Sequence, residues 1–197
     1  MKIYDISQEL FSSVVFPGDP APEKTTLSSM ADGALYNLTS LSMCAHNGTH
    51  VDAPSHFVAE GKTVDQMDLS RMVGYAYVAE YNGTLSREDA RAILAEATAA
   101  HPDAAKRILL KGKATVSYEA AETFAAGDIW LIGNESQTVG PEDGPMAVHQ
   151  LLLGREVVLL EGVRLSHVPA GVYLLSAAPI NLGGVEGSPC RAVLLQL

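Results

Sequence analysis

The sequence predicts a single α/β domain over residues 1–197, in which helices flank a mixed central sheet. The chain of 197 residues has the length of one ordinary domain and is long enough to bury a core. Hydrophobic residues make up 47% of it and charged residues 18%, as in globular rather than disordered proteins. Strand-like and helix-like segments are mixed without strict alternation, repeat or long polar linker, which favours a sheet with both parallel and antiparallel strands.

The first part of the chain contains a loop followed by a strand. Residues 14–24, VVFPGDPAPEK, are rich in proline, glycine and aspartate, so we expect a loop that redirects the chain near Phe16. Residues 35–43, LYNLTSLSM, have a strand-like composition. This strand leads into a segment that is rich in histidine.

Three segments have helical patterns, and the remaining apolar runs are short enough to be strands. The clearest helix covers residues 86–102: Ser86 can cap it, Asp89 stands three residues later, and Pro102 ends it. Two more helices are expected at residues 117–127 and 146–154, and each ends at a glycine. Strands are expected at residues 75–81, 107–111, 128–133, 156–162, 171–180 and 190–197.

The charge and the apolar pattern exclude several classes of partner. A formal net charge of −10 repels nucleic acid phosphates and anionic membrane surfaces, so we expect neither to bind. No apolar run approaches the length of about 18 residues that a membrane helix needs, and the N-terminus lacks the apolar core of a signal peptide. We therefore expect a cytoplasmic protein.

Cys44 and Cys190 form no CxxC motif and are expected to be buried free thiols.

Three of the six histidines lie within residues 46–56, HNGTHVDAPSH. His46, His50, Asp52 and His56 all have even numbers, so in an extended chain their side chains point to one side. A helix would separate Asp52 from the histidines, and the glycine, proline and β-branched residues of this segment disfavour one. The pattern therefore indicates an extended or looped strip of ligands rather than the helical HExxH arrangement.

Imidazole and carboxylate together suit zinc, manganese or iron(II). A catalytic site keeps a position open for water, so a local strip of three ligands completed by one or two distant ones is expected. The alternative is a surface loop whose polar residues bind nothing. Cys44 has the same parity as the strip, which leaves it either a ligand or, as we favour, a structural thiol.

The segment HNGTHVDAPSHF resembles the HxGTHxDxPxHF signature of the cyclase-like metal-dependent hydrolases, a family with formamidase and isatin hydrolase branches. The resemblance extends to DIS at residues 5–7, to FPGDP at residues 16–20 and to the C-terminal stretch at residues 162–194. It implies the swivelling β/β/α fold of that family.

The resemblance also implies roles for individual residues. His46, His50 and Asp52 match metal ligands of the formamidase branch, in which the aspartate bridges two ions. His56 matches the histidine that donates and accepts the proton. His149 and Glu161, twelve residues apart, match the ligands that complete a site for two divalent ions, expected to be Zn²⁺ or alternatively Mn²⁺.

Two departures from the formamidase pattern concern the substrate. Phe16 stands where that branch has a substrate-contacting tryptophan, so an aromatic face remains without its indole donor. Residues 133–140, GNESQTVG, replace that branch's DTPS segment. The metal chemistry is unaffected by these changes, whereas the identity of the substrate is left open.

The resulting hypothesis is a metal-dependent hydrolase of the carbon–nitrogen bond in a small amide. An arylformamidase acting on compounds of the N-formylkynurenine type comes first, with metal-activated water as the nucleophile. The alternatives are a hydrolase of another linear or cyclic amide, as in isatin hydrolase, and a metal-binding module without turnover. The resemblance suggests a homodimer or homotetramer, in which the loop at residues 14–24 could reach a neighbouring subunit.

Overall fold

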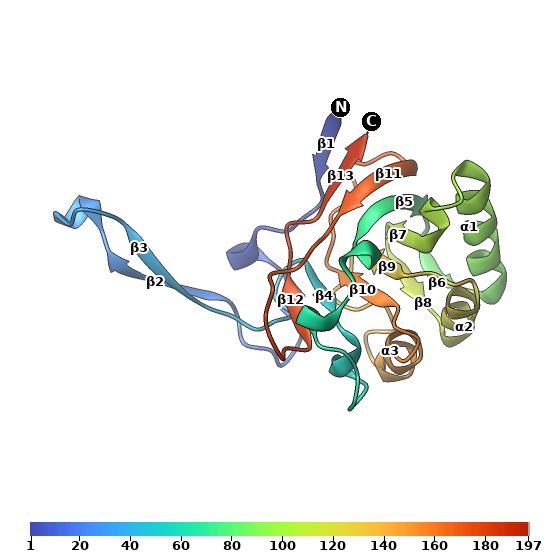
Figure 1. Cartoon of the computed structure of the whole chain (residues 1–197), viewed down its shortest axis with the longest axis horizontal. Helices are drawn as coiled ribbons and strands as arrows, with labels where there is room; N and C mark the ends of the chain where they lie inside the picture. The colour runs from blue at the N-terminus through green and yellow to red at the C-terminus, as the bar shows by residue number, and fades with distance from the viewer. Residues whose placement is uncertain (197) are drawn as a thin grey trace.

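The computed structural model, which describes residues 1–196, is built around one sheet of nine strands in the order β1-β13-β11-β5-β7-β9-β10-β4-β12 (Figure 1). Its strands are β1 (Lys2–Asp5), β13 (Val193–Gln196), β11 (Gly171–Ser176), β5 (Val73–Glu80), β7 (Arg107–Lys111), β9 (Leu131–Asn134), β10 (Val158–Glu161), β4 (His50–Asp52) and β12 (Gly187–Pro189). The four central strands from β5 to β10 run parallel, and the strands on either side pair antiparallel. The predicted mixed sheet is confirmed.

Side chains alternate between the two faces of the sheet along each strand, and a separate hydrophobic core buries each face. On one face Ile108 and Leu159 pack against the helices α1 (Arg87–Ala100), α2 (Tyr118–Ala126) and α3 (Met146–Leu153). On the other face Leu109 and Leu160 join a second core with residues of the outer strands. The expected flanking helices therefore all cover the same face, and Figure 1 shows them on one side of the sheet.

The helix boundaries follow the local signals in the sequence. Ser86 accepts from the backbone N–H of Asp89, whose carboxylate accepts from the N–H of Ser86, which is a capping box at the start of α1. The helix ends at Ala100, slightly before the predicted boundary at Pro102, and His101 forms its C-cap. Gly127 and Gly154 cap the other two helices as expected.

One predicted strand lies outside the central sheet. Strand β3 (Leu38–Ser42) pairs with β2 (Glu23–Ser28), and the two form an arm that extends away from the sheet in Figure 1. The prediction of a loop over residues 14–24 is therefore wrong at its end, since β2 already begins at Glu23. Serine and threonine side chains fill this hairpin, so its sequence lacks the apolar periodicity that marked the other strands.

Several short strands were not predicted. Besides β1, β2 and β12, they are β6 (Gly83–Leu85) and β8 (Ala114–Val116), which form a separate parallel pair beside the helices. Most of them are only three residues long, too short for a pattern. Within residues 1–196, no helix is long and apolar enough to cross a membrane. The cytoplasmic location stays a prediction.

Candidate metal centre

Strand β4 carries the centre of the histidine segment into the sheet. It lies between β10 and β12, and its residues His50 and Asp52 are both 1% exposed. The parity argument holds for these two residues, since they lie on one face of a strand. His46 precedes the strand in a turn that contains Gly48 at φ +69°, a conformation that favours glycine. The extended conformation therefore covers less of the segment than predicted.

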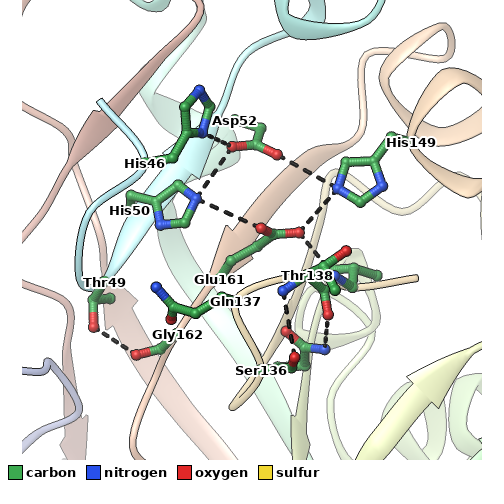
Figure 2. A network of polar contacts seen from close by, with 12 residues as sticks. His46, Thr49, His50, Asp52, Ser136, Gln137, Thr138, His149, Glu161 and Gly162 are labelled. Carbon is green, nitrogen blue, oxygen red and sulfur yellow. Dashed lines mark hydrogen bonds and ion pairs between the residues drawn. The ribbon is translucent and has the colours of Figure 1, made fainter. Parts of the chain in front are cut away.

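Two more elements bring the distant residues of the site to β4. Strand β10 ends at Glu161, which stands opposite His50 in the antiparallel register. Helix α3 supplies His149 from the face that packs on β10. Both side chains are buried, at 3% exposure each. Figure 2 shows how the side chains of these elements, together with His46 from the turn before β4, face one another.

Asp52 lies at the centre of the cluster, and its two carboxylate oxygens face different histidines. Its Oδ1 lies 2.9 Å from His46 Nδ1 and 3.4 Å from His50 Nε2. Its Oδ2 lies 3.7 Å from His149 Nε2. Glu161 also faces two histidines, with Oε1 3.1 Å from His149 Nε2 and Oε2 3.5 Å from His50 Nε2.

The cluster divides into two sets of converging ligand atoms that share one residue. One set contains His46, His50 and Asp52, and the other contains Asp52, His149 and Glu161, with the ligand atoms of each set within 4.8 Å of one another. Among residues 1–196, the buried atoms Asp52 Oδ2 and His46 Nε2 find no hydrogen-bond partner. A buried acceptor without a partner is costly, and a bound cation relieves that cost. The residues therefore fit two divalent ions with Asp52 between them.

Backbone groups fix the orientation of the ligand side chains. The carbonyl oxygen of Gly48 lies 3.1 Å from His50 Nδ1, and that of Pro145 lies 3.0 Å from His149 Nδ1. In both residues Nε2 is thereby left to face the carboxylates. The N–H of Val139 donates to Glu161 Oε1 over 2.8 Å. Such outer contacts set the tautomer and the ring orientation of metal ligands.

The buried charges are paired within the cluster. Burial lowers the pKa of His50, but hydrogen bonds to Asp52 and Glu161 outweigh it and raise that pKa to about 10. Burial raises the pKa of Asp52, yet hydrogen bonds from His46 and His50 bring it well below its usual value. The same balance of burial against a carboxylate partner raises the pKa of His149. Without metal, protons on histidines therefore compensate the carboxylates.

His56 belongs to the same pocket but to neither set of ligand atoms. It ends a 3₁₀ turn over Pro54–His56, so the chain turns away from the ligands directly after Asp52. Its ring stacks on that of His46 with centroids 4.2 Å apart and meets Phe57 edge-on. Burial is the main cause that lowers its pKa below the usual 6.5. At neutral pH the imidazole is uncharged and able to accept a proton.

A cavity of about 220 Å³ opens above the cluster, and we call it the metal cavity. Its lining includes Phe16, His56 and Phe57. The expected aromatic face of Phe16 is therefore at the cavity. Gln137 also lines it and donates from Nε2 to the carbonyl of Val14 over 2.9 Å, which joins residues 133–140 to the loop at residues 14–24.

Glu186 and Gly187, which were not expected at the site, support His46. Glu186 Oε1 lies 3.4 Å from His46 Nε2. A Cβ on Gly187 would lie 2.6 Å from Cε1 of that ring, so glycine is required there. Both residues lie within the resembling stretch at residues 162–194, but a lone glutamate near a glycine has no signal of its own in a single sequence.

The remaining histidines and cysteines lie outside both ligand sets. His101 forms the C-cap of α1, and its ring lies tilted against that of Tyr75. Cys44 is only half-buried, with Sγ 3.9 Å from Asp19 Oδ2, so the expectation of a buried thiol is wrong for this residue. Cys190 is likewise only partly buried as a residue, but it packs against the core, and burial raises the pKa of its thiol to about 12.

Comparisons with known proteins agree with this geometry. The model of the putative cyclase family matches residues 4–140. A kynurenine formamidase of Salinibacter ruber is 32% identical, over 98% of this chain and 97% of its own length. A solved structure described as a potential metal-dependent hydrolase with cyclase activity superposes with a TM-score of 0.81 at 26% identity, covering 98% of this chain and 96% of the other. Isatin hydrolase A from Labrenzia aggregata, bound to benzyl benzoate, has a TM-score of 0.82 over 98% of this chain and 93% of its own, and at 21% identity it shows the shared fold alone.

Proposed function

The chain belongs to the putative cyclase family, and on this premise we propose that it is a metal-dependent hydrolase of small aryl formamides of the N-formylkynurenine type. The observation that carries the proposal is the pair of ligand sets that share Asp52, because the other four residues of these sets line the metal cavity. The name of the Salinibacter ruber relative supports a formamide as the substrate.

We propose that two divalent ions, Zn²⁺ in the first place and Mn²⁺ as the alternative, bind through these sets. His46 and His50 would hold one ion, His149 and Glu161 the other, and Asp52 would bridge them. A site of three histidines and two carboxylates suits either metal. When bound, such ions supply Lewis acidity and lower the pKa of water toward about 7.

The residues around the ions have separate tasks in hydrolysis. His56, neutral and outside the ligand sets, accepts a proton from the attacking water and returns it to the leaving nitrogen. Phe16 packs against the aryl group of the substrate. Burial of the cluster excludes bulk water from the carboxylates and keeps the ligand geometry fixed.

The test is metal content and turnover measured on one preparation of the full chain. We expect close to two ions per chain, release of formate from N-formylkynurenine, loss of activity with a chelator and recovery with Zn²⁺. The variant His101→Ala serves as a control, because this histidine lies at the end of α1, outside the site. Metal-loaded protein that opens isatin but leaves N-formylkynurenine intact would place the chain with the lactam hydrolases. Metal without turnover of any amide would favour the metal-binding module.

We also propose that the β2–β3 arm joins two copies of the chain, as a homodimer or as part of a homotetramer. Every side chain of β3 is exposed, and Leu35 at the tip of the arm is 93% exposed. An isolated two-stranded hairpin is at best marginally stable in water, so a second surface is needed to cover it. Light scattering should give a dimer or tetramer, and Leu35→Asp together with Leu41→Asp should shift it toward the monomer. A monomeric wild type at micromolar concentration would contradict this.

A further inference from the structure

A second cavity, which we call the outer cavity, adjoins the metal cavity. Its volume is about 320 Å³, and it shares Phe16, Gln137 and Thr138 with the metal cavity. Its other walls include the apolar side chains of Val14 and Val15. A substrate whose scissile bond lies over the ligands therefore has room for a further group in the outer cavity.

Arg164 brings a positive charge to the outer cavity, and within residues 1–196 its guanidinium forms no ion pair with a carboxylate. Its Nη1 donates to the carbonyl oxygens of Glu135 and Val163, and its Nη2 donates to Gln8 Oε1 over 2.5 Å. All of these acceptors are uncharged. Within residues 1–196 the Nε of Arg164 forms no hydrogen bond, so the guanidinium retains a donor for a ligand. A guanidinium group matches the two oxygens of a carboxylate.

The two glutamates in the outer cavity are in different situations. The carboxylate of Glu135 accepts from the N–H groups of Gly112 and Leu165, over 2.7 and 2.8 Å, and is thereby fixed. Glu142 is exposed, and its only hydrogen bond within the described part of the chain is a 3.4 Å contact from Ser136 Oγ. The outer cavity thus presents one cation and one anion that are free to bind a ligand.

We propose that the outer cavity binds the amino-acid head group of the substrate, with its carboxylate on Arg164 and its ammonium group on Glu142. This rests on the proposed function and narrows the substrate to aryl formamides that carry a zwitterionic side chain. Apolar walls at Val14 and Val15 accommodate the carbon atoms between the aryl ring and the charged groups.

The first test changes the substrate and leaves the protein intact. Wild-type enzyme is assayed with N-formylkynurenine, with its methyl ester and with 2-formamidoacetophenone, which lacks the head group. The expected result is a loss in kcat/KM of about 10- to 100-fold for both analogues, the usual worth of a charge-assisted pair of hydrogen bonds. Equal kcat/KM for the three compounds would overturn the proposal.

The second test assigns the effect to Arg164. In Arg164→Gln, the ratio of kcat/KM for N-formylkynurenine to that for 2-formamidoacetophenone should fall by about 10- to 100-fold. Lys113→Ala is the matched control, because this exposed cation lies in a neighbouring cavity that Glu142 also lines. Its ratio should stay that of the wild type. A folded Arg164→Gln with the wild-type ratio would refute the role of this residue.

Because Arg164 also holds carbonyl groups in place, Glu142→Gln provides an independent variant. It should raise the KM for N-formylkynurenine more than the KM for its N-acetyl derivative, which has no ammonium charge.

If the enzyme hydrolyses neither N-formylkynurenine nor its N-acetyl derivative, the proposed function fails, but the head-group site can still be tested by calorimetry. Kynurenine should then bind about tenfold more tightly than its methyl ester. Equal affinity for the two compounds would contradict the head-group site.

Discussion

Replacing His56 by alanine separates proton transfer from metal binding. The ring contributes no atom to either set of converging ligands, so both ions should remain bound. A positioned general base is worth about 10²–10⁴ in rate, which corresponds to about 3–5 kcal/mol of transition-state stabilisation. We therefore expect His56→Ala to retain the metal content of the wild type and to lose turnover by about 10²- to 10⁴-fold.

The pH profile provides a second readout of the same variant. Because burial keeps the pKa of His56 below 6.5, the base is unprotonated at neutral pH, and activity should fall only as the pH drops through that lowered pKa. This acid limb should be altered in His56→Ala. Metal content and turnover are measured on one preparation, with His101→Ala as the control. If His56→Ala is purified without metal, His56 is a ligand, and Glu161 becomes the next candidate for the base.

Three further predictions concern the metal centre. Asp52→Ala should remove both ions, because the two oxygens of this carboxylate face different histidines of the cluster. His149→Ala should instead reduce the occupancy of one ion more than that of the other. Metal analysis that finds full metal content in Asp52→Ala would refute the bridging role. Glu186→Gln should weaken metal retention by about 10-fold, because it removes the carboxylate that faces His46 Nε2. Metal retention is measured by competition with a chelator. Unchanged retention would show that Glu186 does not orient the imidazole ring of His46. Because the pKa of His50 is raised to about 10, metal binding must displace a proton from this residue. The apparent metal affinity of the apo-protein should therefore rise by about tenfold per pH unit between about pH 7 and 9. Calorimetry in buffers of different ionisation enthalpy should detect the released proton.

The stability of the metal-free protein should decrease as the pH rises, whereas its metal affinity increases. The folded-state pKa of His50 is raised, so the stabilisation it provides is complete below its unfolded pKa of about 6.5 and is lost as pH rises toward about 10. Removing metal should therefore make thermal stability more sensitive to alkaline pH than it is in the loaded protein.

Local patterns predicted those parts of the site that local structure determines. His50 and Asp52 could be placed on one face because two residues on a strand always share one. His149 and Glu161 lie on separate elements, and no local pattern brings them to β4; the register of Glu161 with His50 does so, which is a tertiary property. The carboxylate of Glu161 attracts notice because it ends the apolar run VVLL, but the ligand roles of both residues follow from the family resemblance.

The arm and the supporting residues show where single-sequence reasoning ends. Residues 35–43 have the composition of a sheet strand, and only the three-dimensional pairing shows that their partner is β2 rather than the central sheet. Glu186 supports His46 from a loop more than a hundred residues away, and its effect depends on a distance of 3.4 Å. Sequence periodicity reports which face of an element is buried, and it contains no information on such contacts.

The placement of the residues explains how one metal site can serve different substrates. Asp52 and Glu161 lie on adjacent strands in the interior of the sheet, where burial on both sides fixes their geometry. The walls that face the substrate come instead from the loop with Phe16 and from residues 133–140, which Gln137 joins. These are the two segments in which the sequence departs from the formamidase pattern. Because loops change without disturbing a sheet, substitutions there alter the substrate while the ligands and His56 stay in place.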